Sequence, residues 1–114
     1  MKKDFKIFLN DILESIERIE KYTEGKTEEE FLEDYEKQDA IIKRLENIGE
    51  ALKNIPAEFK KKHSKNPSEQ IAGMRNVLIH EYSGVIMQRV WNTAKNDIPK
   101  LKKQISNLVS AITK

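Results

Sequence analysis

The 114-residue sequence contains no cysteine, which excludes disulfide bridges, thiol nucleophiles and cysteine-based zinc sites. Aromatic residues make up only 7% of the chain, and it has just four glycines and three prolines. No run of about 18 apolar residues occurs, so we expect no membrane-spanning helix. With 35% charged residues, this composition favours one all-α domain over residues 1–114, located in the cytoplasm, rather than a sheet protein or a disordered tail.

The net charge of +2 hides an asymmetry between the two halves of the chain. Residues 1–50 carry nine Lys and Arg against 15 Asp and Glu, whereas residues 51–114 carry 12 against four. The second half, at net +8, is therefore the half that would attract a polyanion. Its densest basic run, from Lys60 to Lys62 with Lys65, is either a patch that steers phosphates or a solvated loop.

Apolar residues at helical spacing predict an up-and-down helical bundle of four main helices plus a short fifth. The first helix is expected over about residues 3–22, and Gly25 is a suitable residue to end it. Thr27 and Glu30 can then form a capping box that opens a second helix, expected to run unbroken over about residues 28–54.

The second helix has a bundle-like seam that includes two positions of uncertain role. Gln38 and Asp39 are polar among apolar neighbours, so they either face solvent at the edge of the bundle or line a cleft. The residues of the seam are Phe31, Tyr35, Gln38, Ile42, Leu45, Gly49 and Leu52, widened by Ile41, Ile48 and Ile55.

Prolines mark the helices of the second half. Pro56 can open the short helix, and Pro67, after a capping Asn66, can open the next main helix. A last apolar stripe runs from Val90 to Ile112. Pro99 lies inside it and predicts a kink or a short break near residues 95–98.

The segment Ile71–Val85 carries most of the groups capable of chemistry. It places Arg75, Asn76, His80 and Tyr82 within eight residues, spaced R-N-x3-H-x-Y. On a regular helix Asn76 and His80 would share a face with Gly73, opposite the core-facing stripe, which suggests a cleft or a second subunit on that side. Arg75 and His80 would lie about 140° apart, so one straight helix cannot direct both side chains at one phosphate.

These residue types suit cleavage of RNA without a metal or cofactor. A histidine near its ordinary pKa serves as general base or acid, and an arginine matches the oxygens of a phosphate. A single His80 leaves the reaction one proton-transfer group short, whereas a two-fold homodimer with facing motifs supplies two. Tyr82 would contact the phosphate, and Asn76 would orient His80 or the substrate.

Each motif residue also has an ordinary structural explanation. His80 could be a capping or hydrogen-bonded polar residue, Arg75 a surface ion-pair partner, Tyr82 a core aromatic residue and Asn76 a helix-surface residue. Two rival classes therefore stay open: a non-catalytic module that binds a nucleotide or a protein partner, and a structural bundle whose Gly73/Asn76/His80 face is a dimer contact.

The motif resembles the R-x4-H-x-Y signature of HepT-like toxins in the HEPN superfamily. The likeness extends to the block from Asp39 to Ala51, to Ile71–Met74 before Arg75, and to the segment from Val90 to Pro99. Glu50 matches a recurring position of the family. An aromatic residue that the family often has before the motif helix is missing here, where the sequence reads Asn66-Pro67-Ser68-Glu69.

The resemblance implies a homodimeric helical bundle that acts as a metal-independent endoribonuclease, with a cleft built from both copies of the motif. It further implies a type VII toxin–antitoxin system. The partner would be an MntA-like nucleotidyltransferase antitoxin that transfers AMP groups onto the motif tyrosine, here Tyr82. A bulky anion beside Arg75 would occupy the phosphate site and repel RNA.

Overall fold

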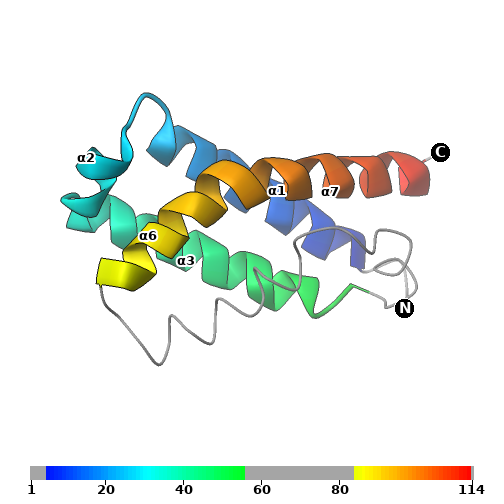
Figure 1. The fold of residues 1–114 in the computed structure, drawn as a ribbon. Coiled ribbons are helices and arrows are strands. Elements are labelled where there is room, and N and C mark those ends of the chain that lie inside the picture. Colours follow the sequence, from blue (N-terminus) through cyan, green and yellow to red (C-terminus); the bar gives the residue numbers. More distant parts are fainter. Residues whose placement is uncertain (1–4, 56–83, 114) are drawn as a thin grey trace.

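The computed structural model describes residues 5–55 and 84–113, and the regular structure in both ranges is helical (Figure 1). The all-α prediction is therefore confirmed, and three of the four expected main helices fall within this part. The short helix expected from Pro56 and the motif helix expected from Pro67 lie outside the described residues. The elements are α1 (Phe5–Thr23), α2 (Glu28–Leu32), α3 (Tyr35–Leu52), α6 (Gly84–Asn92), a π-helical turn (Thr93–Asp97) and α7 (Ile98–Thr113).

The core lies where α1 packs between α3 and the rod formed by α6, the π-helical turn and α7. From α1 the core receives Leu9, Ile12, Ile16 and Ile19, which are all fully buried. These residues follow the helical spacing that the sequence analysis used to predict this helix, and they form the apolar stripe of α1. The other core residues are Phe31, Ile41, Ile42, Leu45, Ile48, Ala51, Leu52, Ile55, Met87, Val90, Trp91, Ala94, Ile98, Leu101, Ile105 and Leu108.

Of the helices described, none is long and apolar enough to cross a membrane.

The turn after α1 forms as its sequence predicts. Gly25 adopts a positive φ of 71°, which ends the helix at a position where a side chain would be strained. Thr27 and Glu30 then form the expected capping box: the Thr27 hydroxyl accepts from the Glu30 N–H at 3.1 Å, and the Glu30 carboxylate accepts from the Thr27 N–H at 2.9 Å. Two N–H groups at the start of α2 are thereby satisfied.

The prediction of one unbroken helix over residues 28–54 is wrong. The chain breaks after Leu32, and Asp34 starts a new helix by accepting a hydrogen bond from the Lys37 N–H at 3.1 Å. Aspartate is a strong N-cap residue, so it competes here with continuation of the helix. The break lets α2 turn toward α6, where the rings of Phe31 and Trp91 lie 5.3 Å apart.

The break also decides the two uncertain polar positions. Gln38 is buried, so both alternatives considered for it, facing solvent and lining a cleft, are wrong. Its Nε2 donates to the carbonyl oxygens of Phe31 and Leu32 at 3.0 and 3.1 Å. It thus ties the end of α2 to α3. Asp39 is exposed, as the solvent alternative predicts. Tyr35 was expected in the seam but is 74% exposed, because α3 begins there and directs it outward.

We expect Gln38→Met to lower the free energy of unfolding by about 1–3 kcal/mol, because it removes the side-chain donor to the Leu32 and Phe31 carbonyls while nearly preserving side-chain volume. The Phe31 carbonyl retains the Asp34 N–H at 3.1 Å. Chemical denaturation monitored by circular dichroism measures the change. Gln88→Met makes the same chemical change at an exposed position of α6 and should shift stability by no more than about 0.5 kcal/mol. Equal losses in the two variants would contradict the tying role of Gln38.

Pro99 is accommodated by the π-helical turn, so the break predicted near residues 95–98 is confirmed. Proline has no N–H to donate to the carbonyl of Lys95, four residues earlier. The chain widens by one residue over Thr93–Asp97, and the Ile98 N–H donates to the Thr93 carbonyl, five residues back. The predicted stripe is buried on both sides of this turn, from Val90 through Ile98 to Leu108, and the side chain of Ile112 lies outside the described residues.

Candidate functional site

The four motif residues predicted from the sequence, Arg75, Asn76, His80 and Tyr82, lie outside the described residues, as does the basic run from Lys60 to Lys62. Their proposed roles stay predictions. The described helices define where this stretch of chain is attached: it follows Ile55, three residues beyond α3, and it precedes Gly84, the first residue of α6.

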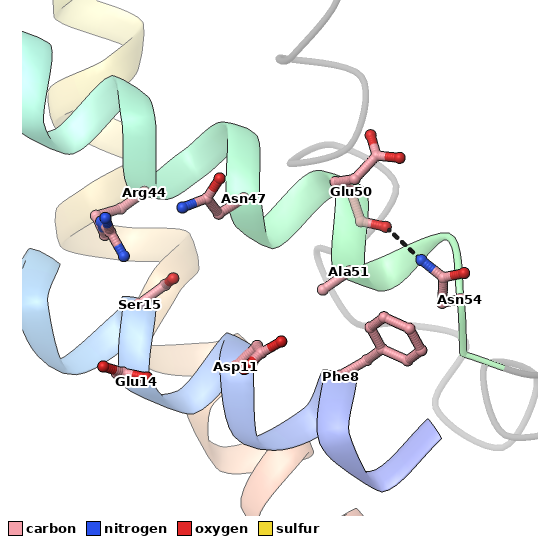
Figure 2. A pocket seen from close by; sticks show the side chains of 9 residues that line it. All are labelled: Phe8, Asp11, Glu14, Ser15, Arg44, Asn47, Glu50, Ala51 and Asn54. Atoms are coloured by element: carbon pink, nitrogen blue, oxygen red, sulfur yellow. Dashed lines mark hydrogen bonds between the residues drawn. The ribbon is translucent and has the colours of Figure 1, made fainter. Parts of the chain in front are cut away.

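A second candidate site does lie in the described part. An open cleft of about 310 Å³ separates the first half of α1 from the second half of α3 (Figure 2). Small-molecule sites typically start at about 300 Å³, so the cleft is large enough for one small ligand group. It is lined by Phe8, Asp11, Glu14, Ser15, Arg44, Asn47, Glu50, Ala51 and Asn54.

The cleft forms because two helices present matching polar faces. On α3, Arg44, Asn47 and Ala51 are spaced three and four apart, so they share one side of the helix, and Asn54 follows three positions later, just beyond the end of α3. On α1, Phe8, Asp11 and Ser15 follow the same spacing. The Arg44 end of the cleft faces Ser15, and the Glu50–Asn54 end faces Phe8 (Figure 2).

Some polar groups of the cleft are already engaged by neighbours on their own helix. The Glu14 carboxylate pairs with Arg18 at 3.0 Å, and Glu50 lies 3.8 Å from the Lys53 ammonium. Asn54 donates to the Glu50 carbonyl at 3.1 Å (Figure 2). These exposed pairs contribute little to stability, about 0–1 kcal/mol each.

Four other polar groups of the cleft have no such partner. Within the described residues, the Arg44 guanidinium, the Asn47 amide and the Asp11 carboxylate form no hydrogen bond or ion pair. The same holds for the Ser15 hydroxyl, although Ser15 is only 4% exposed. The cleft therefore offers both donors and acceptors that the protein itself leaves unused there.

A second hollow, of about 630 Å³, lies between the end of α1 and the π-helical turn. Three of its charged groups are engaged: the Lys102 ammonium of α7 donates to both carboxylate oxygens of Glu20 at 3.0 and 3.2 Å, and the Lys95 ammonium lies 5.5 Å from the centre of the Trp91 ring. The Glu20–Lys102 pair joins α1 to α7, so we assign this hollow a structural role. Across the described residues, no group of three His, Asp or Glu side chains is placed to hold a metal ion.

Sequence reasoning missed the α1–α3 cleft. Its charged residues look like the solvated faces of two separate amphipathic helices until the two faces are placed opposite each other. One signal was present: Ser15 interrupts the apolar stripe of α1 between Ile12 and Ile16, at a spacing where a buried aliphatic residue is the norm. A polar residue in such a position marks a place where the core opens.

The helical fold defines the chain as a member of the all-α class, and comparison with known proteins identifies its family. The family model described as "Ribonuclease HepT-like" matches residues 12–108, a span that contains the cleft residues from Glu14 onward and the complete R-N-x3-H-x-Y motif. The chain belongs to the HepT-like family. No solved structure shows a significant match.

Two relatives show how far the similarity extends. The chain is 47% identical over 108 residues to "Probable ribonuclease HepT" of Thermococcus cleftensis, covering 95% of this chain and 98% of that protein. It is 49% identical over 114 residues to "Gamma-glutamylcyclotransferase and putative RNase MJ0434" of Methanocaldococcus jannaschii. That alignment covers the whole chain but 51% of the relative, so the chain spans about half the length of that protein.

Proposed function

We propose that this protein is a metal-independent endoribonuclease. The observation that carries the proposal is the match of residues 12–108 to the HepT-like ribonuclease family, because that span includes Arg75, Asn76, His80 and Tyr82 in the signature spacing. Relatives named as ribonucleases over nearly the full length of this chain support it.

The proposed reaction uses only groups of the motif. A base removes the proton of the ribose 2′-hydroxyl, the resulting oxygen attacks the phosphorus, and an acid protonates the leaving 5′-oxygen. His80 from each of two facing chains would fill these two roles. Arg75 would stabilise the charge that develops on the phosphate, with Asn76 and Tyr82 assisting. The expected products are a 2′,3′-cyclic phosphate end and a free 5′-hydroxyl end.

The same proposal includes a homodimer, because one pocket then contains two imidazoles. It also includes regulation as the toxin of a type VII toxin–antitoxin system in the cytoplasm. There an MntA-like nucleotidyltransferase transfers AMP from ATP onto the Tyr82 hydroxyl and releases pyrophosphate. The added phosphate would compete with RNA for Arg75.

Cleavage of RNA by the purified chain in EDTA tests this function. We expect cleavage to persist with the metal chelated and to leave cyclic phosphate ends, detected by their resistance to direct ligation. We expect the same protein carrying AMP on Tyr82, verified by mass spectrometry, to leave RNA intact.

Intact RNA at high excess of unmodified dimer would contradict the nuclease. The alternative would then be a non-catalytic helical module that binds a nucleotide or a nucleotidyltransferase partner. The observation that favours this alternative is the α1–α3 cleft, whose unused donors and acceptors suit a small polar ligand without requiring chemistry.

A further inference from the structure

We propose that the α1–α3 cleft binds one unstacked guanine base of a single-stranded RNA. The inference rests on the proposed function in that it takes RNA as the ligand. It assigns a recognition role to residues outside the R-N-x3-H-x-Y motif. The cleft would select sequence, whereas the motif would cleave.

Two polar groups of the cleft match the two edges of guanine. Guanine presents two adjacent acceptors, O6 and N7, which a guanidinium binds bidentately, and two adjacent donors, N1–H and the N2 amino group, which suit a carboxylate. Arg44 supplies the first partner and Asp11 the second, from opposite walls of the cleft (Figure 2). Neither side chain has a partner within the described residues.

Ser15 provides an independent indication that the cleft takes a polar ligand. Ser15 is only 4% exposed and lines the cleft, and its hydroxyl forms no hydrogen bond within the described part of the chain. A helical serine without a ligand would ordinarily bond to a backbone carbonyl one turn earlier, as the Thr23 hydroxyl does to Ile19 at 3.0 Å. A buried hydroxyl left open toward a cavity is a group that a ligand can satisfy.

The other end of the cleft suits the flat face of a base. The Phe8 ring stands at that end opposite Ala51, the smallest side chain of the lining (Figure 2). Single-stranded RNA is typically read by bases that leave the stack, pack on an aromatic ring and hydrogen-bond through their edges. Phe8 is partly buried against the core, so the ring is held in place rather than free to turn away.

The charges of the lining argue against a phosphate as the ligand. Among the described residues that line the cleft, Arg44 is the one cation, while Glu14 and Glu50 are paired with Arg18 and Lys53. The Asp11 carboxylate on the opposite wall offsets Arg44, so an anion would meet little net attraction. A neutral base with donors on one edge and acceptors on another needs no such net attraction. Adenine has no N1–H donor, and uracil has only one donor on its pairing edge, so both would leave the Asp11 carboxylate less well satisfied.

Equilibrium binding in the non-cleaving His80→Ala protein tests the inference. The probes are fluorescein-labelled oligouridines that carry one central guanosine or one central adenosine, measured by fluorescence anisotropy in EDTA. We expect the guanosine probe to bind roughly tenfold more tightly, and Arg44→Gln and Asp11→Asn each to abolish that preference. Lys43→Gln and Glu17→Gln make the same charge changes at exposed positions outside the cleft and should retain it.

The outcomes separate this inference from the proposed function. If wild-type protein cleaves RNA but the two probes bind equally, or if Arg44→Gln behaves like Lys43→Gln, the cleft does not read guanine and the nuclease stands. If the preference is present and sensitive to Arg44 while no RNA is cleaved, the cleft is a base site and the nuclease fails. If Arg44→Gln and Asp11→Asn change the oligomeric state in light scattering without changing the preference, a second copy covers the cleft and the inference is wrong. Thermal unfolding of each variant verifies that it is folded.

Discussion

His80→Ala is expected to lower the rate of RNA cleavage in EDTA by about 10²- to 10⁴-fold, the range that a positioned proton-transfer group contributes. The loss should reach the upper part of that range if the facing copies of His80 supply both the base and the acid, because one substitution then removes both. Single-turnover rates at saturating protein measure the change, since they separate chemistry from binding. A variant that cleaves at the wild-type rate would exclude His80 from the reaction.

Mixing wild-type and His80→Ala chains shows whether one pocket needs both copies. Random exchange at equal amounts leaves about one quarter of dimers with two intact histidines. Activity should therefore fall to about one quarter of that of the undiluted wild type if both are required, and to about one half if each chain works alone. The His80→Asn variant keeps a polar side chain of similar shape. Testing it in the same way checks that the loss of activity reflects the missing proton transfer and not a change in local packing.

Ile16→Ala should lower the free energy of unfolding by about 2–5 kcal/mol, the second large effect expected for this chain. Ile16 is fully buried at the centre of α1, the helix that packs against both α3 and the α6–α7 rod. Removing three carbons there loses apolar burial and leaves a cavity that neighbours from two directions cannot fill together. Urea denaturation measures this decrease. The decrease is large, because the whole free energy of unfolding of a domain is only about 5–15 kcal/mol.

The same helix supplies a matched control. Ile7 is 60% exposed, so Ile7→Ala removes the same atoms from a position that already contacts water. Its effect should stay within about 0.5 kcal/mol. If the two substitutions destabilise the protein equally, the division of α1 into a buried and an exposed face is wrong.

Much of the fold could be predicted from sequence because periodicity and capping are local. The stripe of α1, the turn at Gly25, the capping box at Thr27 and the break ahead of Pro99 each depend on residues close together in the chain. The division between α2 and α3 could not, because Asp34 competes with helix continuation and the outcome depends on the docking of Phe31 against Trp91. Gln38 was ambiguous for the same reason: its partners exist only after the chain has turned.

The same difference between local signals and tertiary packing applies to the two candidate sites. The motif was visible because four chemically capable residues stand within eight positions, and the family match now covers all of them, while their roles stay predictions. The α1–α3 cleft was not visible, because Asp11 and Arg44 are 33 positions apart and become opposed only when the two helices pair antiparallel. Such a site is a property of tertiary packing, for which a single amphipathic pattern carries no information.

The π-helical turn makes the packing of α6 sensitive to insertions and deletions in this part of the chain. The extra residue between Thr93 and Asp97 offsets the rotational phase of α6 from that of α7 by about 100°, and both helices still bury their apolar sides. An insertion or deletion there would swing α6 around its own axis and carry Trp91 away from Phe31. Because Tyr82 stands only two positions before α6 in the sequence, the phase set at this turn also fixes where Gly84 lies, the residue to which the segment with the R-N-x3-H-x-Y motif is attached.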